Sequence, residues 1–325
     1  MASIRRLILL SVIFAAIMIP GATVAVAQAP AAISPRQQGQ PARQESSSVR
    51  LATELVSLSV AVTDRSGRAI TGLTKADFKV YENGVEQPIS FFSDDDSPVS
   101  WGLVLDRSRS MEGMIQEVYQ TALHTIDQGT KDDDMFVVAF NEQAELVCDF
   151  TSDRDRLESA IRGLRADGNT ALYDAVALAL DHLQRGRHQK KVLVVVTDGE
   201  DNRSRLTFRQ LVERAREADV LIYTVGMFGS MVGMRGSAAR DELKKLAEET
   251  GAFAHFPRDP EKCRTMMMEI AGEVSRQYSL GFYPTDPTRD GKWRKLRIAV
   301  TRPGSEAKYA TRTRRGYYVP GRQVK

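Results

Sequence analysis

The sequence predicts an α/β protein in which a doubly wound, mostly parallel sheet is inserted between strands of a small all-β, sandwich-like domain. Between residues 98 and 275, short apolar runs alternate with segments of helical spacing, which is typical of a parallel sheet covered by helices. The flanking regions, 50–96 and 276–320, instead alternate apolar and polar residues with the period of half-buried strands. Turn signals such as Asn83-Gly84 separate these strands.

The composition is that of an ordinary globular protein, large enough for one large and one small domain. The chain has 325 residues, of which 42% are hydrophobic and 27% charged, and its formal net charge of +3 is too small to point to a partner. The four histidines lack the spacing of zinc ligands, neither cysteine has a neighbouring histidine, and no nucleophile elbow or phosphate loop occurs.

The first fifty residues read as a targeting segment and a tether. Arg5 and Arg6 precede an apolar run to Ile19, and Ala25-Val26-Ala27 has the small residues of a cleavage site, so residues 1–27 are predicted to be a secretory signal peptide. An uncleaved membrane anchor is the alternative, although the apolar run is short for one. Residues 28–49 lack aromatics and are predicted to be a disordered linker.

A cleaved signal peptide predicts an exported protein, periplasmic or extracellular, with no stable membrane span. In such a compartment Cys148 and Cys263 could pair. Their wide separation gives no disulfide framework, and two separately buried thiols are the favoured interpretation.

Both ends of the chain supply β-strands. Residues 55–62 and 78–81 are predicted strands, and Asn83-Gly84 predicts a hairpin whose return strand is 87–92. Three further strands are predicted near the C-terminus, at 278–283, 295–300 and 307–312. Because three or four strands rarely form a stable unit alone, we expect the two sets to form one sandwich, with 94–98 as the linker into the inserted domain.

The inserted domain has a regular succession of elements. Strands are predicted at 135–140, 145–150, 191–197, 220–225 and 252–256, in addition to the apolar run that ends at Asp106. Helices are predicted at 112–128, 154–164, 172–184, 207–218, 240–250 and 260–276. Ligands of such sheets bind at the carboxyl ends of the strands, near a switch in strand order.

Three loops at that edge carry hard oxygen donors. The first is Asp106-Arg107-Ser108-Arg109-Ser110, the second contains Thr170, and the third begins at Thr197-Asp198. Two carboxylates, three hydroxyls and water molecules are a plausible shell for Mg²⁺ or Mn²⁺, with one position left open. The plainer alternative is that these residues only cap helices and turns.

These loops make the chain resemble the von Willebrand factor A (VWA) domain family, which has a Rossmann-like fold and a metal-ion-dependent adhesion site (MIDAS). The family pattern Asp-x-Ser-x-Ser, then Thr, then Asp matches Asp106, Ser108, Ser110, Thr170 and Asp198 in order. The resemblance covers about residues 98–275, and the flanking strands look like a bacterial secreted subgroup. It implies that the first four residues contact the cation or its waters and that Asp198 acts through water.

The resemblance also implies a function. An acidic side chain of a protein partner would complete the cation's shell, so we expect an exported, non-enzymatic binding or adhesion module. The alternatives are a metal-assisted hydrolase that uses the same oxygens with Glu200 or Asp201 as base, and a structural envelope scaffold. The sequence departs from the common bacterial Asp-Thr-Ser-Gly-Ser at Arg107 and Arg109, which would weaken cation binding by repulsion unless they point away or pair with Glu112 or with a ligand of the cation.

Two further features have competing interpretations. The Met-rich loop 227–238 leaves the end of a strand and is either an adaptable contact or a plain surface loop. Between residues 289 and 325, twelve Lys and Arg face only two acids, which would attract an anionic envelope surface or form a solvated strand face. Nucleic acid is disfavoured as a partner by export and by the lack of interleaved aromatic residues.

Overall fold

The computed structural model describes residues 54–65, 68–94, 97–228, 234–301 and 309–321. Its central feature is a six-stranded sheet with the order β10-β9-β8-β5-β6-β7, in which only β7 is antiparallel to its neighbour. These strands are β5 (Val99–Asp106), β6 (Asp134–Phe140), β7 (Ala144–Thr151), β8 (Lys190–Thr197), β9 (Leu221–Gly226) and β10 (Ala254–His255).

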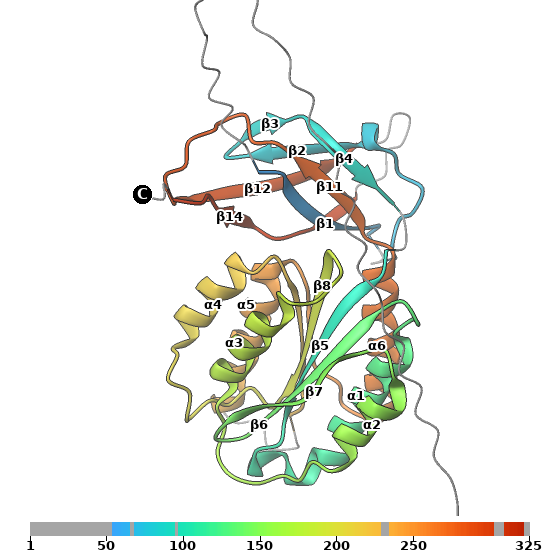
Figure 1. Cartoon of the computed structure of the whole chain (residues 1–325), viewed down its shortest axis with the longest axis vertical. Helices are drawn as coiled ribbons and strands as arrows, with labels where there is room; N and C mark the ends of the chain where they lie inside the picture. The colour runs from blue at the N-terminus through green and yellow to red at the C-terminus, as the bar shows by residue number, and fades with distance from the viewer. Residues whose placement is uncertain (1–53, 66–67, 95–96, 229–233, 302–308, 322–325) are drawn as a thin grey trace, which may run out of the picture. The chain divides into compact units, whose positions relative to one another are not determined.

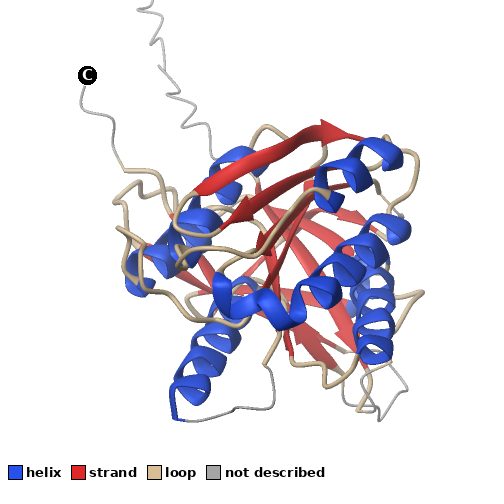
Figure 2. Cartoon of the chain, turned by 90° about the horizontal axis from the view of Figure 1, so that it is seen from below, coloured by secondary structure: helices blue, strands red, loops and turns tan. Residues whose placement is uncertain are grey.

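Helices cover both faces of this sheet (Figures 1 and 2). They are α1 (Ile115–Gln128), α2 (Arg154–Arg162), α3 (Leu172–Leu183), α4 (Phe208–Glu217), α5 (Met234–Thr250) and α6 (Pro260–Ser275). Alternate residues of β5 point to opposite sides: Leu103 and Leu105 pack with α1, α2 and α6, whereas Val104 packs with α3, α4 and α5. The middle of each central strand, residues 103–105 in β5 and 192–196 in β8, is apolar throughout because both of its faces are buried.

Two four-stranded sheets lie outside this α/β part, with the orders β13-β1-β11-β4 and β14-β12-β2-β3. Their strands are β1 (Val56–Thr63), β2 (Phe78–Glu82), β3 (Val85–Gln87), β4 (Ile89–Ser93), β11 (Tyr278–Phe282), β12 (Trp293–Val300), β13 (Ala310–Arg312) and β14 (Gly316–Tyr318). Each sheet combines strands from before and after the α/β part, and one apolar core, which includes Leu58, Tyr278 and Ile298, draws on both sheets. The doubly wound sheet inserted into a β-domain is therefore confirmed.

The predicted hairpin is partly wrong. β2 does turn at Asn83-Gly84, but the return strand β3 ends at Gln87, and β4 pairs with β11 in the other sheet. Pro88 separates the two strands; because it has no backbone N–H, it cannot continue the hairpin ladder. The chain changes sheets there.

Other elements also differ from the sequence predictions. The helix predicted from Glu112 is preceded by a 3₁₀ segment, Arg109–Met114, and α1 begins only at Ile115. The predicted loop 227–238 ends early because α5 already begins at Met234, and β14 was not predicted at all.

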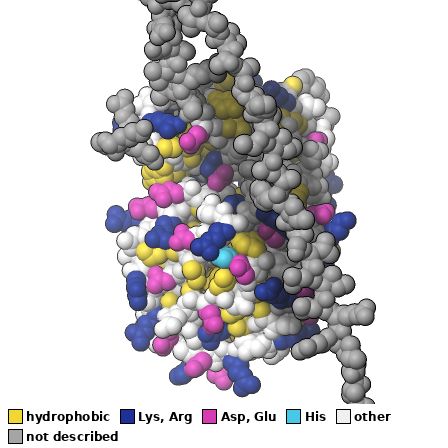
Figure 3. Space-filling model, in the orientation of Figure 1, with side chains coloured by type: hydrophobic (Ala, Val, Ile, Leu, Met, Phe, Trp, Pro, Cys, Tyr) yellow, Lys and Arg dark blue, Asp and Glu magenta, His cyan; other side chains and the backbone are white. Residues whose placement is uncertain are grey.

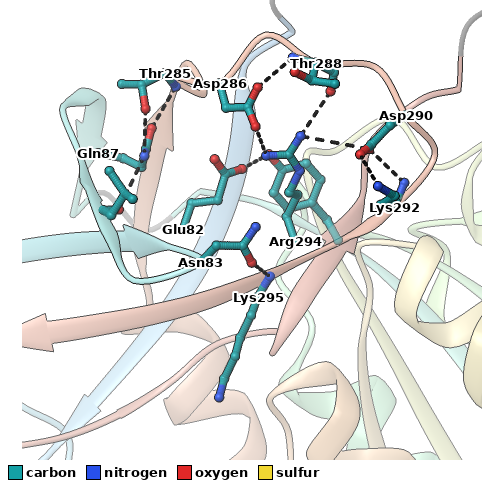
Figure 4. A network of polar contacts seen from close by, with 12 residues as sticks. Glu82, Asn83, Gln87, Thr285, Asp286, Thr288, Asp290, Lys292, Arg294 and Lys295 are labelled. Carbon is teal, nitrogen blue, oxygen red and sulfur yellow. Dashed lines mark hydrogen bonds and ion pairs between the residues drawn. The ribbon is translucent and has the colours of Figure 1, made fainter.

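A buried arginine in β12 holds the β-domain together (Figure 4). The Arg294 guanidinium is 2.5 Å from the Asp286 carboxylate and also donates to the carbonyl of Thr288 at 3.1 Å. On the neighbouring strand, Glu82 accepts a short hydrogen bond from the Tyr317 hydroxyl. A buried charge is tolerated only when it is paired in this way, so the network fixes the segment after β11 against β12.

Arginines of the C-terminal segment tie the β-domain to the α/β part, and residues 51–325 form one unit. Arg312 pairs with Glu273 at 2.6 Å and Arg314 with Asp219 at 3.1 Å. Some of the basic side chains near the C-terminus therefore form ion pairs within the protein. Over the face shown in Figure 3, basic and acidic side chains intermingle.

The remaining predictions concern the termini, membrane and thiols. The predicted signal peptide, 1–27, and linker, 28–49, lie outside the described residues. No helix in the described ranges is long and apolar enough to cross a membrane. Cys148 and Cys263 are both buried and unpaired, as two separate thiols would be.

Candidate functional site

The candidate site lies at the carboxyl ends of β5 and β8, which are adjacent parallel strands. Because Leu105 is in register with Val196, the next residues, Asp106 and Thr197, leave the sheet side by side. The third contribution, Thr170, comes from the loop that leads into α3. The doubly wound topology thus brings together three loops that are distant in sequence.

Asp106 is fully buried and held by two hydrogen bonds. One carboxylate oxygen accepts from the backbone N–H of Ser108 at 2.8 Å, and the other accepts from the hydroxyl of Thr197 at 2.6 Å. Burial, and secondarily the charge of nearby Asp198, raise the pKa of Asp106 to about 7. The fold therefore keeps a carboxylate in an environment that opposes its charge.

The two serines of the first loop differ in exposure. Ser108 is buried and Ser110 is exposed, and their hydroxyl oxygens are 3.0 Å apart. Ser108 is also the N-cap residue that precedes the 3₁₀ segment, with an extended backbone at φ −66° and ψ 164°. The loop turns sharply enough to bring Asp106, Ser108 and Ser110 into one small cluster.

The second loop is bound to the first by two backbone hydrogen bonds. The N–H of Arg109 donates to the carbonyl of Gly168 at 3.0 Å, and the N–H of Asp167 donates to the carbonyl of Arg107 at 2.9 Å. Gly168 has a positive φ of 76°, a conformation that favours glycine. The loop position next to Ser108 is thereby fixed by main-chain contacts.

Asn202, in the third loop, holds the main chain of Thr170 in place. The side-chain oxygen of Asn202 accepts from the N–H of Thr170 at 3.0 Å, and the N–H groups of Asn202 and Arg203 both donate to the carbonyl of Thr170. Thr170 is 2% exposed. Its main chain is firmly placed, although among the described residues its hydroxyl makes no hydrogen bond to the other four predicted residues.

Asp198 lies at the solvent side of the cluster. It is partly exposed, and one of its carboxylate oxygens accepts from the N–H of Glu200 at 3.1 Å. The intervening Gly199 has φ +78°, and a Cβ there would come within 3.1 Å of Ala239 and Leu243. A glycine is needed at this turn for both reasons.

The donor set fits a hard divalent cation. Two carboxylates close enough to repel each other, one of them buried, stand beside two hydroxyls in mutual contact, and oxygen ligands of this kind suit Mg²⁺ or Mn²⁺. Within the described ranges, no three His, Cys, Asp or Glu side chains gather as a metal site. A cation here would therefore depend on the hydroxyls as well as the carboxylates.

Arg107 and Arg109 are both paired with acids outside the predicted ligand set. Arg107 lies 3.5 Å from the Glu145 carboxylate, and Arg109 lies 3.1 Å from that of Asp167. The Nε of Arg107 is buried and makes no hydrogen bond with any of the described residues. The partners are neither Glu112 nor a predicted ligand, so the pairing expected from the sequence is wrong in its partners, and each arginine instead pairs with an acid from a neighbouring strand or loop.

Two acids hold the loops through hydrogen bonds that the sequence did not predict. Asp174 accepts hydrogen bonds from the N–H groups of Arg205 and Leu206 at 3.0 and 3.1 Å. Asp201 accepts from the N–H of Tyr173 at 3.1 Å and from the Ser204 hydroxyl. An acid in the first turn of a helix was the available signal, since such residues often bind free N–H groups.

Outside these loops, the histidines and the predicted Met-rich loop take structural contacts. His182 lies 2.9 Å from Asp149 and stacks on Phe150. Phe228, from the described part of the predicted loop 227–238, lies against Phe256, and the Arg240 guanidinium covers both rings at 4.9 and 4.6 Å. Phe228 is therefore packed against the body of the protein.

The chain is similar to two curated relatives of uncharacterised role. One, from Synechocystis sp., is 32% identical over 108 residues, which cover 32% of this chain and 26% of the relative. The other, from Borreliella burgdorferi, is 28% identical over 181 residues, covering 52% of this chain and 50% of the relative. The chain thus spans half or less of the length of these relatives.

Solved structures with a similar arrangement include a von Willebrand factor type A protein from Catenulispora acidiphila. It is 14% identical, with a TM-score of 0.49, and the match covers 75% of this chain and 72% of that one. The von Willebrand factor domain of the type V pili tip protein Mfa5 from Porphyromonas gingivalis is 14% identical, with a TM-score of 0.46, covering 55% and 95%. Residues 102–269 match the sequence model of the von Willebrand factor type A domain, and the chain belongs to that family.

Proposed function

We propose that the protein is an exported, non-enzymatic binding module. It captures an acidic group of a protein partner through a Mg²⁺- or Mn²⁺-dependent site formed by Asp106, Ser108, Ser110, Thr170 and Asp198. The observation that carries this proposal is the state of Asp106, a fully buried carboxylate that lies close enough to Asp198 for their charges to oppose each other. A divalent cation between such groups would offset both the burial cost and the repulsion.

The exposure of the donors supports capture of an external group. Asp106, Ser108 and Thr170 are buried, whereas Ser110 is exposed and Asp198 partly so. A cation held by the buried donors would thus keep one side open to solvent. A carboxylate is the ligand that a hard cation with an open position favours.

The hydrolase alternative has less support. Asp201 already accepts hydrogen bonds from Tyr173 and Ser204, so its carboxylate serves to anchor the loop to α3. Glu200 is exposed and lies in the same loop. A general base needs a carboxylate that can reach the attacking water, and only Glu200 retains that freedom.

Cation binding can be tested by titration calorimetry of the purified protein with MnCl₂ and MgCl₂. We expect Asp106→Ala and Ser108→Ala to abolish or strongly weaken binding. Asp132→Ala is a matched control, because Asp132 is an exposed carboxylate in the turn before β6, at the opposite end of the sheet. Equal Mn²⁺ affinity in the wild type and Asp106→Ala would disprove the proposed site.

Partner capture needs a separate assay. The tagged protein should retain a partner from the envelope fraction in Mg²⁺ and release it in EDTA, and Asp106→Ala should retain none. If the partner is retained equally in EDTA and by Asp106→Ala, the scaffold alternative would be favoured. Turnover of generic ester or phosphate substrates that is lost in Asp106→Ala would favour the hydrolase.

A further inference from the structure

A cavity of about 520 Å³ lies at the end of the six-stranded sheet opposite to the proposed metal site. One wall comes from strands β1, β11 and β4 of the β-domain, and the other from the residues that begin β8 and β9 and end α4. All lining residues belong to the unit 51–325. The volume falls within the range of roughly 300–1,000 Å³ that is typical of small-molecule sites, which often lie between domains.

The β-domain wall presents a row of hydroxyls. β1 alternates apolar residues, which enter the sandwich core, with Ser57 and Ser59, which line the cavity. Ser59 pairs with Ser279 of β11, and Ser279 pairs with Ser93 of β4, so three serines lie side by side across three strands. Within the described chain, the hydroxyls of Ser57, Ser59 and Ser279 make no hydrogen bond.

The opposite wall carries basic side chains whose hydrogen-bonding groups are only partly paired. The Lys191 ammonium donates to the carbonyl of Gln184 at 3.0 Å, and no carboxylate of the described residues is within ion-pair distance of it. Arg314 pairs with Asp219 at 3.1 Å and donates to the carbonyl of Ser57 at 2.6 Å, yet its Nε is buried without a partner.

The charge balance of the cavity is positive. Asp219 is the one carboxylate among the described lining residues, and it is already paired with Arg314. Two other lining cations, Arg187 and Arg216, are paired with Asp134 and Glu249 outside the cavity. Asp219 and Asp134 lie near enough to attract the Lys191 ammonium, but among the described residues it forms no direct ion pair and remains available to an anion.

We propose that this cavity binds the phosphate group of a small phosphate monoester. Three free hydroxyls and one ammonium offer more donors than the two oxygens of a carboxylate can satisfy. A phosphate has three terminal oxygens and charge-assisted bonds to match them. These donors are half-buried, and a ligand that accepts their hydrogen bonds gains affinity.

The rim favours an organic phosphate over the free ion. Leu55 and Phe91, which line the cavity, are 40% and 49% exposed. An apolar substituent on the phosphate would cover part of this surface. The site is independent of the proposed cation site, since the two lie at opposite ends of the same sheet.

Titration calorimetry with phenyl phosphate, inorganic phosphate and benzoate tests the proposal. We expect phenyl phosphate to bind at least about tenfold more tightly than benzoate, which has a similar ring but only two anionic oxygens. Weaker binding of inorganic phosphate would identify an organic phosphate as the ligand, and equal binding would identify free phosphate. No binding of either phosphate at millimolar concentration would overturn the proposal.

Two variants connect binding to the cavity. Lys191→Met and Ser279→Ala should each weaken phenyl phosphate binding, the first by about tenfold or more and the second by about threefold to tenfold. Burial lowers the pKa of Lys191, so a neutral side chain of similar length should fold normally.

Lys79→Met, on the other β-sheet, is the matched control for loss of a lysine, and it should bind like the wild type. Asp106→Ala should also bind normally, so a failure of the cation site leaves this test unaffected. Unchanged affinity in both cavity variants would show that the phosphate binds elsewhere, and the assignment would be wrong.

Discussion

Asp106→Asn should make the metal-free protein more stable at alkaline pH, although it removes the central ligand of the proposed cation site. The side chain is fully buried, and its pKa is raised from 3.8 to about 7 by burial first and by the charge of Asp198 second. Ionising this carboxyl in the folded protein is therefore costly when no cation is present. Asparagine has nearly the same shape and carries no charge.

The magnitude follows from the shift in pKa. One pKa unit corresponds to about 1.4 kcal/mol, so a shift of about three units costs the folded state on the order of 4 kcal/mol once the carboxyl is fully ionised. Unfolded Asp106 titrates near 3.8, so this penalty is absent below that pH, grows as the pH rises and is complete above about 7.

The gain from the substitution is somewhat smaller than this penalty. Asparagine can still accept from the N–H of Ser108, but its NH₂ group would face the Thr197 hydroxyl. In the wild type, this hydroxyl donates to Asp106 and accepts from the N–H of Gly199. Rearranging that bond costs about 1 kcal/mol. The net expectation is a stabilisation of about 3 kcal/mol at pH 8 and a slight destabilisation, of less than about 1 kcal/mol, at pH 4, where the carboxyl is protonated in the folded protein and only the cost of rearrangement remains.

Urea unfolding in EDTA at pH 4 and pH 8 measures the effect, with the free energy of unfolding obtained by linear extrapolation. Asp198→Asn is the matched variant; it removes the second cause of the shift and leaves Asp106 buried, so its gain should be smaller. Addition of Mg²⁺ should stabilise the wild type and leave Asp106→Asn unchanged. If Asp106→Asn were less stable than the wild type at pH 8 in EDTA, the description of Asp106 as an unfavourable buried charge would be refuted.

Three other substitutions probe the loops and the sheet. Asn202→Ala removes the acceptor for the N–H of Thr170 and should weaken Mn²⁺ binding by roughly tenfold to a hundredfold in calorimetry; full affinity would show that this bond does not orient the site. Gly102→Ala places a Cβ 2.5 Å from a buried ring atom and should lower the free energy of unfolding by about 1–3 kcal/mol or more in urea, and an unchanged value would contradict the tight packing. Arg107→Thr combined with Arg109→Gly should change Mg²⁺ affinity by less than about fivefold, because each arginine is already paired near the surface; a larger rise would restore the repulsion hypothesis.

The parts of the fold that the sequence predicts are those with a strong single signal. β5 and β8 each contain a short apolar run, residues 103–105 and 192–196, which is typical of a strand buried on both faces. β3 and β4 were merged because both are short and one residue apart, and only tertiary pairing decides that β4 joins β11. β14 is only three residues long, and it pairs with β12, which is too distant in sequence for a local pattern to reveal the pairing.

In the candidate site, the sequence likewise predicts residues at strand ends better than residues within the loops. Asp106 and Asp198 could be found from the sequence because each directly follows or ends a buried strand, and the topology then brings them together. Thr197 and Asn202 could not, since their roles depend on hydrogen bonds across loops that are distant in sequence. Local patterns identify the side chains that face a ligand better than the residues that hold those side chains in place.

The two arginines show how such pairing changes a sequence-based inference. Beside Asp106, Arg107 and Arg109 suggested a cation site weakened by two positive charges. In the fold, Arg107 leans toward Glu145 of the β7 strand and Arg109 toward Asp167 of the neighbouring loop, each within 3.5 Å. Both acids are distant from Asp106 in sequence, so the compensation arises only when the loops meet, and the first loop then carries nearly balanced charge around its two serines.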